Sequence, residues 1–552
     1  MHNRVIALMI DLGVVDRMEI AMQKNRWAPH QGPVMGRSLM VSTAHPTASQ
    51  AGLSVMKAGG NAVDAAVCIS WMQTVLKPAR CQIGGDLFYL VFAAETGTVT
   101  AINGSGAAPA AATLDAYASG IPDRGIRSVS TPGFVDGVLT AHARWGSRPL
   151  GELMDPAIEL ARDGSPVSLR LSQLIEQFGD LLRSNDATAA VYMPGGRVPQ
   201  PGEILRQPDL ARTLEAIRDG GGDAFYDGEF PRALERDARK LGGHFTASDL
   251  PDHTTDVRDP ISREYRGLTV YEQPPVSQGY ILLEELGIIE GFDLAGRLPD
   301  DPEVIHLMIE AKKLAFADSR HHGGDPCRST FDVNRLLDPG FLAQRRAQID
   351  PQRAAVRPAA GSLPHAVHDT TSFAVVDGAG NAVAAIQSVF SPWGSGVVVE
   401  GTGVLLNNRL TGFTTEPGHA NVLEPGKRPV HTLNQYLITK KGHPILVGGT
   451  PGGQQQVQTN MQVISAIVDA GYDVQTALDL PRWGHAEGRD ITMESRYDEP
   501  VYAELERRGH RVRRTGAWDG LMGRATVIAI RERDGVRMGA LDLRSEGQAA
   551  GW

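Results

Sequence analysis

Apolar, β-branched and turn-forming residues around position 375 follow the pattern of a β-hairpin. Residues 371–377 are largely β-branched or aromatic, residues 378–381 read Gly-Ala-Gly-Asn, and residues 382–388 return to strand-like side chains. β-Branched and aromatic residues favour strands, whereas glycine and asparagine supply the backbone conformations of tight turns. The pattern therefore predicts two antiparallel strands, and Thr370 and Thr371 stand at the start of the first.

The N-terminal part of the chain predicts a strand, two helices and another strand. Residues 39–42 are strand-like, and residues 44–58 have helical apolar spacing that a glycine pair ends. Asn61 is a suitable N-cap for a second helix. A glycine turn then leads into an apolar strand over residues 87–91.

Helices are expected to dominate the middle of the chain, before a segment of different composition. Residues 130–250 are mainly helical in pattern, and residues 302–318 place apolar side chains on one helical face. Residues 344–369 are rich in arginine, alanine and proline and have little periodicity, which is typical of a mobile connector. An ordinary interdomain linker is the alternative.

Composition and charge exclude several classes of function. Of the residues, 42% are hydrophobic and 21% are charged, as in ordinary globular proteins. A chain of 552 residues is too long for a single small hydrophobic core. A net charge of −10 argues against a nucleic-acid or anionic-membrane partner. No apolar run reaches membrane-spanning length, so we expect no membrane partner either.

The N-terminus and the cysteines favour the cytoplasm. Residues 5–10 are apolar, but Asp11 interrupts them and no small-residue cleavage site follows, so a secretory signal is not expected. Residues 1–37 are interpreted as an N-terminal extension. Cys68, Cys81 and Cys327 are odd in number and lack metal-like spacing, which predicts buried thiols in a reducing compartment.

Metal and nucleotide sites are not predicted. His321 and His322 are adjacent and cannot share a helical face as a zinc-binding pair would. The glycine-rich segments at residues 84–85 and 448–453 lack the lysine and the spacing of phosphate-binding loops. We therefore expect no metal and no organic cofactor.

Four motifs follow one another in an informative order. They are TTSFAVVDGAGNAVAA from Thr370, FSPWGSGVVVEGTGVLLNN from Phe390, PGKRPVHT from Pro425 and GGTPGG from Gly448. In this order they resemble the γ-glutamyltranspeptidase family of N-terminal-nucleophile hydrolases. The resemblance implies an α+β fold, a four-layer αββα sandwich. It also implies cleavage between Asp369 and Thr370 into a large subunit, 38–369, and a small subunit, 370–552, with a homodimer of that heterodimer left open.

The chemistry of an N-terminal threonine explains such a cleavage. A hydroxyl needs an adjacent base, and the α-amine of the same residue is one. An α-amine titrates at about 7.7–8.0 and a lysine at about 10.4, so a useful fraction of the amine is unprotonated at neutral pH. The hydroxyl of Thr370 could also attack the Asp369 carbonyl, giving an ester that water opens. The alternative is that Thr370 is an ordinary strand residue.

The resemblance assigns further catalytic residues. Ser388 stands where the family has a threonine whose hydroxyl contacts the nucleophile. Gly452 and Gly453 match the glycine pair whose backbone N–H groups form the oxyanion hole, where the missing Cβ leaves room for close approach. A tight turn is an equally compatible reading of that pair. Thr371 is expected to anchor the strand or to help position Thr370 for substrate.

The residues that hold a γ-glutamyl group in the family are nearly all replaced. At the matching positions this sequence has Ser105, Phe390, Arg409, Gly412 and the pair His431-Thr432. Asp86 also replaces a residue that is usually small. A site that reads a buried ammonium loses affinity steeply without its carboxylate. We therefore do not expect γ-glutamyl transfer to be the main activity.

The replacements suggest a different acyl group. Arg409 suits bidentate binding of a carboxylate, His431 can donate or accept, and Phe390 fills the space of a former polar contact. The segments NNR, PGKRPVHTL and LDLPRW resemble the amidohydrolase branch of the family, to which oxamate amidohydrolase belongs. Structural ion pairing of Arg409 is the alternative reading.

The sequence thus predicts a self-cleaving N-terminal threonine amidohydrolase or acylase. Its substrate would be a small amide that carries a carboxylate, and the reaction would pass through an acyl-enzyme. Two alternatives stay open. One is a γ-glutamyltransferase or glutathione hydrolase with a rebuilt pocket, and the other is an uncleaved binding module without catalysis.

Overall fold

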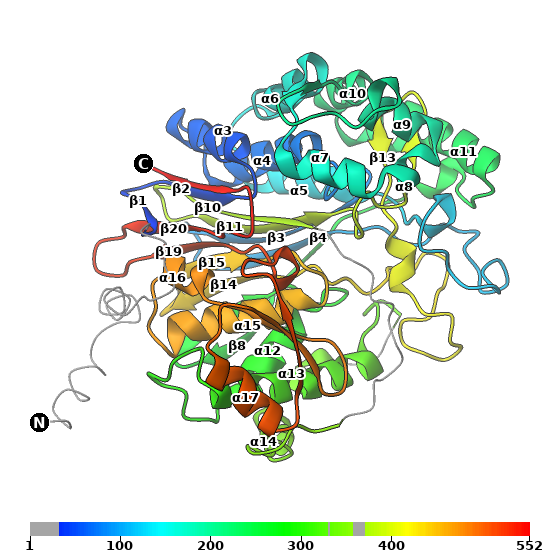
Figure 1. Cartoon of the computed structure of the whole chain (residues 1–552). Coiled ribbons are helices and arrows are strands. Elements are labelled where there is room, and N and C mark those ends of the chain that lie inside the picture. The colour runs from blue at the N-terminus through cyan, green and yellow to red at the C-terminus, as the bar shows by residue number, and fades with distance from the viewer. Residues whose placement is uncertain (1–31, 329–331, 357–369) are drawn as a thin grey trace, which may run out of the picture.

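Two seven-stranded sheets stack face to face, and helices cover the outer face of each. The computed structural model describes residues 32–328, 332–356 and 370–552, and Figure 1 shows the four layers. The predicted αββα sandwich is confirmed. The cleavage position Asp369, residues 1–31 of the predicted extension and residues 357–369 of the predicted connector lie outside the described residues.

The upper sheet contains the predicted hairpin, whose two strands pair antiparallel. In spatial order its strands are β21 (Gln548–Gly551), β2 (Met40–Thr43), β10 (Thr371–Val376), β11 (Ala382–Ser388), β3 (Asp86–Ala93), β4 (Thr98–Gly104) and β7 (Asp256–Arg258). Strand β10 begins directly after Thr370, so the sheet fixes the position of that residue.

Strand β10 is apolar from Phe373 to Val376 because both of its faces are buried. Phe373 and Val375 pack into the core under the upper helices, whereas Ala374 and Val376 pack against the other sheet. Successive side chains of a strand point to opposite faces, so a central strand of a four-layer fold has no polar side. This burial holds Thr370 in a rigid setting.

The upper helices cover the outer face of this sheet in two tiers (Figure 1). The inner tier, α3 (Pro46–Lys57), α4 (Ala62–Leu76) and α5 (Phe134–Trp145), contacts the strands, and α6 (Leu150–Asp163) and α10 (Pro208–Asp223) pack outside it. The predicted cap of α4 is confirmed, because the Asn61 side chain accepts from the N–H groups of Val63 and Asp64. Every residue of α4 is buried, and the small side chains of its first turns, such as Ala62, Ala65 and Ala66, allow close packing.

The lower sheet and its helices form the other half of the sandwich. In spatial order its strands are β1 (Val34–Gly36), β20 (Arg537–Leu541), β19 (Thr526–Ile530), β15 (His443–Gly449), β14 (Gln435–Lys440), β9 (Leu268–Glu272) and β8 (Ile261–Tyr265). Its helices include α12 (Gly279–Ile289), α13 (Pro302–His322), α15 (Gln455–Val468) and α16 (Val474–Asp479). Strand β1, from the predicted extension, is paired with β20.

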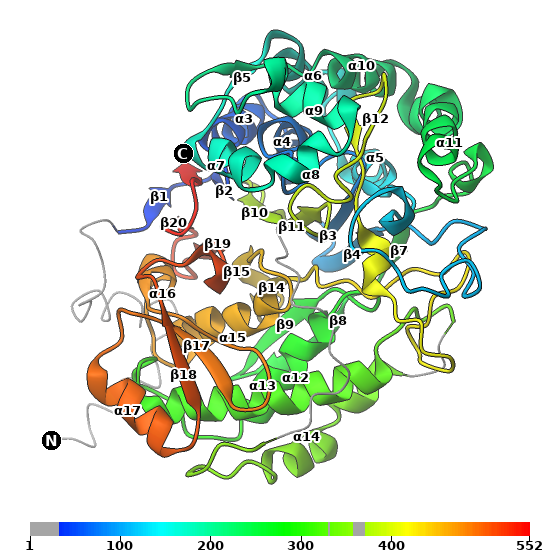
Figure 2. The ribbon, with the colours of Figure 1, turned by 45° about the vertical axis from the view of Figure 1, so that its right-hand side comes forward.

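Peripheral elements frame one edge of the sandwich. Figure 2 shows β17 (Asp490–Glu494) and β18 (Arg511–Thr515) beside α15, with α7 (Leu169–Gln177) and α8 (Gly179–Arg183) in the half above. Strand β16 (Trp483–His485) completes this small sheet, and α17 (Glu499–Arg507) precedes β18. Helix α14 (Pro339–Arg346) includes the first three residues of the predicted connector.

Two further expectations concern the environment of the chain. The prediction of buried thiols is right for Cys68 and Cys81 but wrong for Cys327, which is exposed and accepts from the guanidinium of Arg258. A short loop after α13, and not a core element, carries that cysteine. Among the described helices, none combines the length and apolar character needed to cross a membrane.

Candidate active site

Thr370 and Ser388 lie together at the end of the hairpin. Thr370 is buried, and its Oγ1 lies 3.1 Å from the Oγ of Ser388, the last residue of β11. The Ser388 hydroxyl also accepts from the N–H of Phe390 at 2.7 Å. The structure therefore brings the predicted nucleophile and its predicted hydroxyl partner within hydrogen-bond distance.

Thr371 points elsewhere and serves the fold. Its hydroxyl donates to the side-chain carbonyl of Gln73 in α4, at 2.5 Å, and it is fully buried. This contact ties the start of β10 to the helix behind it. The geometry matches an anchoring role for Thr371, and its hydroxyl is engaged away from Ser388.

The predicted glycine pair lies in the loop between β15 and α15. Gly452 and Gly453 have φ values of 140° and 58°, a region that favours glycine. Within the described part of the chain, neither amide donates to a backbone carbonyl. The loop also precedes the first turn of α15, where the helix dipole favours negative charge. These features suit an oxyanion hole.

The loop is held in place from two sides. The Ser372 hydroxyl contacts the carbonyl of Gly449 at 3.3 Å, which links the loop to β10. The Thr450 hydroxyl accepts from the N–H of Arg524 at 2.8 Å, just before β19. The first contact fixes the loop against the strand that follows Thr370, and the second fixes it against the segment before β19.

A fully buried ion pair lies beside the hydroxyl pair. Asp86 is the partner of Ser388 in the register of β3 with β11, so both side chains lie on the same face of the sheet. Arg409 donates from Nε to Asp86 Oδ2 at 2.9 Å, and both residues are 0% exposed. The Arg409 guanidinium also stacks over Phe390, 4.3 Å from the ring centroid.

Three polar atoms of this ion pair have no hydrogen-bond partner among the described residues. Among the described residues, neither Nη1 nor Nη2 of Arg409 makes a hydrogen bond, and the same holds for Asp86 Oδ1. A buried polar group without a partner costs stability, more so when charged. Burial raises the pKa of Asp86 and lowers that of Arg409, and each charge opposes the shift of the other. The free atoms are suited to a ligand.

His431 borders the same ion pair. Its Nδ1 lies 4.0 Å from Asp86 Oδ2, its ring packs against Phe88, and neither ring nitrogen has a partner among the described residues. Burial and the nearby charges of Arg409 and Arg428 lower the pKa of His431 well below its usual value. The imidazole is therefore neutral at neutral pH and offers one donor and one acceptor.

The two other predicted pocket residues are positioned less directly. The Ser105 hydroxyl donates to Asn103 Oδ1 at 2.6 Å, and the Ser105 carbonyl accepts from Arg428 Nε at 3.0 Å. Thr432 is buried next to His431, and its carbonyl accepts from the Asn434 side chain. Where the family resemblance implies an arginine at position 105, Arg428 thus brings a guanidinium against the Ser105 carbonyl.

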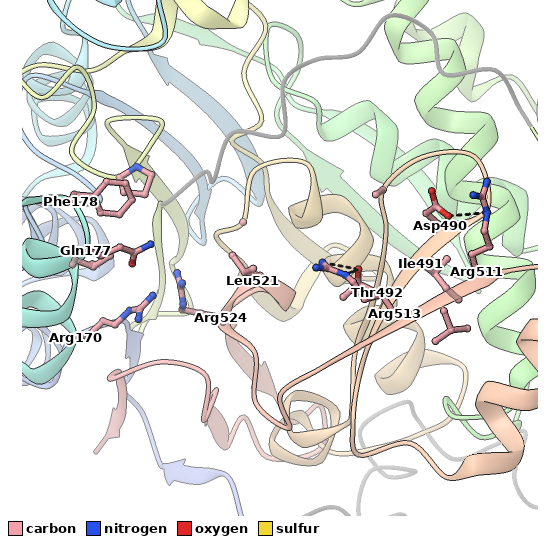
Figure 3. A pocket seen from close by; sticks show the side chains of 16 residues that line it. Arg170, Gln177, Phe178, Asp490, Ile491, Thr492, Arg511, Arg513, Leu521 and Arg524 are labelled. Carbon is pink, nitrogen blue, oxygen red and sulfur yellow. Dashed lines mark hydrogen bonds and ion pairs between the residues drawn. The ribbon is translucent and has the colours of Figure 1, made fainter. Parts of the chain in front are cut away.

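An open cleft of about 860 Å³ reaches the glycine loop from the outside. Its lining includes Gly452, Phe178 and Pro392, and Pro392 belongs to the loop that carries Phe390. Figure 3 shows its walls, with α7 on one side and β17 and β18 on the other. The cleft was not predicted from the sequence, because its walls come from segments more than three hundred residues apart.

The comparison with known families settles where the chain belongs. The γ-glutamyltranspeptidase model matches residues 48–552. The chain belongs to the γ-glutamyltranspeptidase family. Prediction of this family from the motif order is confirmed, and with it the N-terminal-nucleophile hydrolase type of the fold.

Relatives in the γ-glutamyltranspeptidase family carry different activities in their names. The glutathione hydrolase-like YwrD proenzyme of Bacillus subtilis (strain 168) is 36% identical, over 94% of this chain and 99% of its own length. The oxamate amidohydrolase proenzyme of Klebsiella pneumoniae is 33% identical, over 93% and 98%. The crystal structure of cephalosporin acylase from Bacillus halodurans has a TM-score of 0.89 and 35% identity, and covers 96% of this chain and 98% of that one.

These relatives establish an enzyme of the γ-glutamyltranspeptidase family that acts on amide bonds. Identities of 36%, 33% and 35% are too close to one another to select a substrate. The choice of substrate therefore has to come from the side chains around Thr370.

Sequence reasoning missed a cluster of potential metal ligands outside this site. His306, Glu310 and His510 are buried, with one ligand atom of each within 4.8 Å of the others. His306 Nδ1 and His510 Nε2 are 2.8 Å apart, which is a hydrogen bond, and Lys313 pairs with Glu310 at 2.7 Å. A lysine beside the carboxylate disfavours a cation, so the cluster is explained by its own hydrogen bonds.

Proposed function

We propose that cleavage of the Asp369–Thr370 bond frees Thr370 as the nucleophile of an amide hydrolase whose substrates have a small, carboxylate-bearing acyl group. The observation that carries this proposal is the buried Arg409, whose two terminal nitrogens have no partner among the described residues, on the same side of the sheet as Ser388. The proenzyme names of the relatives support processing of the precursor.

The proposed reaction uses one residue as nucleophile and base. Thr370 Oγ1 attacks the amide carbonyl, and its proton passes to the freed α-amine of Thr370. Ser388 orients the threonine hydroxyl across 3.1 Å. The oxyanion forms next to the Gly452 and Gly453 amides, which act without reorganisation in a buried site. The amine half leaves with the proton from the α-ammonium, and water then attacks the acyl-enzyme ester to release the acid and regenerate Thr370.

The acyl half of the substrate occupies the buried cluster. Arg409 presents Nη1 and Nη2 as a fork for a carboxylate, while Nε stays on Asp86. Asp86 thereby orients the guanidinium, and the Phe390 ring closes one side of it. Neutral His431 adds a hydrogen bond without adding charge. A short acyl chain with a terminal carboxylate matches these groups.

One observation favours a second candidate, γ-glutamyl hydrolysis or transfer. Asp86 Oδ1 is a buried acceptor without a partner among the described residues, and an α-ammonium is a suitable donor for it. Arg409 would then bind the α-carboxylate of the same glutamyl group. The glutathione hydrolase-like relative adds weight to this candidate.

A substrate panel with a common leaving group separates the two candidates. Glutaryl, γ-glutamyl and butyryl 4-nitroanilides differ in the acyl half alone, and oxamate extends the panel to a very small amide. We expect the highest kcat/KM for the glutaryl anilide and the lowest for the butyryl anilide. A higher kcat/KM for the γ-glutamyl anilide than for the glutaryl anilide would instead support the second candidate.

A further inference from the structure

The cleft outside the glycine loop is strongly basic. Four arginines line it, Arg170, Arg511, Arg513 and Arg524, against one acidic side chain, Asp490. The chain as a whole has a net charge of −10, so this concentration of positive charge is local. A cleft lined by one sign of charge raises the local concentration of ligands of the opposite sign.

Two of the four arginines keep an unneutralised charge. Asp490 pairs with Arg511 at 3.1 Å, and Arg513 donates to the neutral hydroxyl of Thr492. Arg170 makes a long contact of 3.5 Å with the Gln173 side chain. In the described ranges, no carboxylate lies within ion-pair distance of the Arg170 or Arg513 guanidinium.

The basic cleft is joined to the candidate oxyanion loop. Gly452 lines it, and the Arg524 backbone N–H is bonded to Thr450, two residues before that glycine. Figure 3 shows Arg170 and Gln177 of α7 pointing towards Arg524, with Arg513 on the far side of the cleft. A molecule in the cleft would thus have one end at the scissile carbonyl and the rest among guanidinium groups.

We propose that this cleft binds the amine half of the substrate and selects amines that carry carboxylates. The inference rests on the proposed function, in which the acyl half fills the Arg409 cluster and leaves the cleft for the departing half. Arg170 and Arg513 bind the carboxylates from opposite walls. Because these side chains are partly or fully exposed, their attraction is graded and weakened by salt.

The test compares two chromogenic anilides with the same acyl group. Glutaryl-4-nitroanilide has a neutral leaving group, and glutaryl-3-carboxy-4-nitroanilide adds one carboxylate. After correction for their hydroxide-catalysed rates, we expect about a tenfold higher kcat/KM for the carboxylated anilide at low ionic strength. The preference should shrink strongly at about 0.5 M NaCl, where the Debye length is only a few ångströms.

Variants of the full-length protein test whether the preference for the carboxylated anilide comes from the cleft arginines. The double variant Arg170→Ala/Arg513→Ala should lose the preference, so that its kcat/KM for the carboxylated anilide falls to that for the neutral anilide. Arg212→Ala, which removes an exposed arginine of α10 that pairs with Asp209, is the matched control and should keep the preference. Equal kcat/KM for both anilides in the wild-type protein, or an unchanged preference in the double variant, would overturn the proposal.

A binding arm keeps the proposal testable if neither anilide is hydrolysed, an outcome that would instead count against the proposed function. Calorimetry with benzene-1,3,5-tricarboxylate measures binding of a carboxylate-bearing molecule to the cleft without turnover. Salt-sensitive binding by the wild-type protein that is lost in the double variant would support the cleft. Absence of binding, or binding unaffected by the two substitutions, would refute it.

Discussion

Two arginine–aspartate pairs of the same geometry stand in opposite environments. Arg409 Nε lies 2.9 Å from Asp86 with both side chains 0% exposed, and Arg511 Nε lies 3.1 Å from Asp490 with exposures of 67% and 55%. The first pair belongs to the buried cluster at Ser388, and the second lines the open cleft. The two pairs therefore have similar N–O distances but differ in their exposure to solvent.

This difference determines what each pair contributes. A buried charge that loses its partner has no water to replace it, so the Asp86–Arg409 pair holds its two side chains in one arrangement. An exposed pair exchanges its partner for water or salt at little cost, so the Asp490–Arg511 pair tunes the field of the cleft. The following substitutions examine that contrast.

Removal of the buried acid should have the largest effect on stability. Asp86→Ala leaves the Arg409 charge unpaired and should destabilise the protein by about 3–5 kcal/mol. Asp490→Ala is the matched substitution in the exposed pair, with an expected change below about 1 kcal/mol. Urea unfolding of the two variants measures the difference, and similar losses would mean that the environment does not separate the pairs.

Replacement of the buried arginine should affect recognition of the acyl group. Arg409→Lys keeps a positive charge but loses the two-nitrogen fork, so kcat/KM for the glutaryl anilide should fall about a hundredfold. Activity on the butyryl anilide, which has no terminal carboxylate, should change little. Arg511→Lys serves as the control. A parallel loss on both anilides would show that Arg409 supports the fold alone.

The hydroxyl beside the proposed nucleophile should have a smaller effect on activity. Ser388→Ala removes the contact to Thr370 Oγ1 and should lower kcat about tenfold, because one hydrogen bond to the reacting group is lost. Ser388→Thr restores the hydroxyl and should restore most of kcat. If alanine at position 388 leaves kcat unchanged, the contact has no role in the reaction.

The pKa of His431 predicts a pH dependence of stability. Its pKa is depressed in the folded protein by burial and by Arg409 and Arg428, so below about pH 6.5 the unfolded chain binds a proton that the folded chain does not. Unfolding free energy should fall with decreasing pH by up to about 1.4 kcal/mol per unit from this residue. His431→Gln should reduce the change of Tm with pH. The control is His443→Gln, at an exposed histidine, which should leave that change as it is.

Local patterns revealed the hairpin, the Asn61 cap and the glycine loop, because each depends on residues that are close in sequence. The motif order also predicts that Thr370, Ser388, Gly452 and Gly453 share one site, and the structure brings Thr370 within hydrogen-bond distance of Ser388. The sequence does not predict the partner of Arg409, because Asp86 is 323 residues away, and the two meet where the segment before Arg409 bonds to the segment before Asp86, as between Asn407 and Gly84. Asp86 departs from the small residue usual at its position, and a charged residue at the start of a buried strand is the available signal.

The arginine cleft could not be read from the sequence for the same reason. Arg170 follows the N-cap of a short helix, and Arg513 lies on an edge strand of polar residues, where arginine is ordinary. Only the folded chain shows that both face one space beside Gly452. Which charged side chains gather around one cleft depends on how distant segments pack, and the periodicity of apolar residues carries no information on that.

Intact mass under denaturing conditions, with N-terminal sequencing of each fragment, tests the central claim most directly. We predict two chains, the smaller of which begins at Thr370, and a single full-length chain for Thr370→Ala. A single full-length chain from the wild-type protein, inactive on the whole anilide panel, would contradict the assignment of Thr370 as an N-terminal nucleophile.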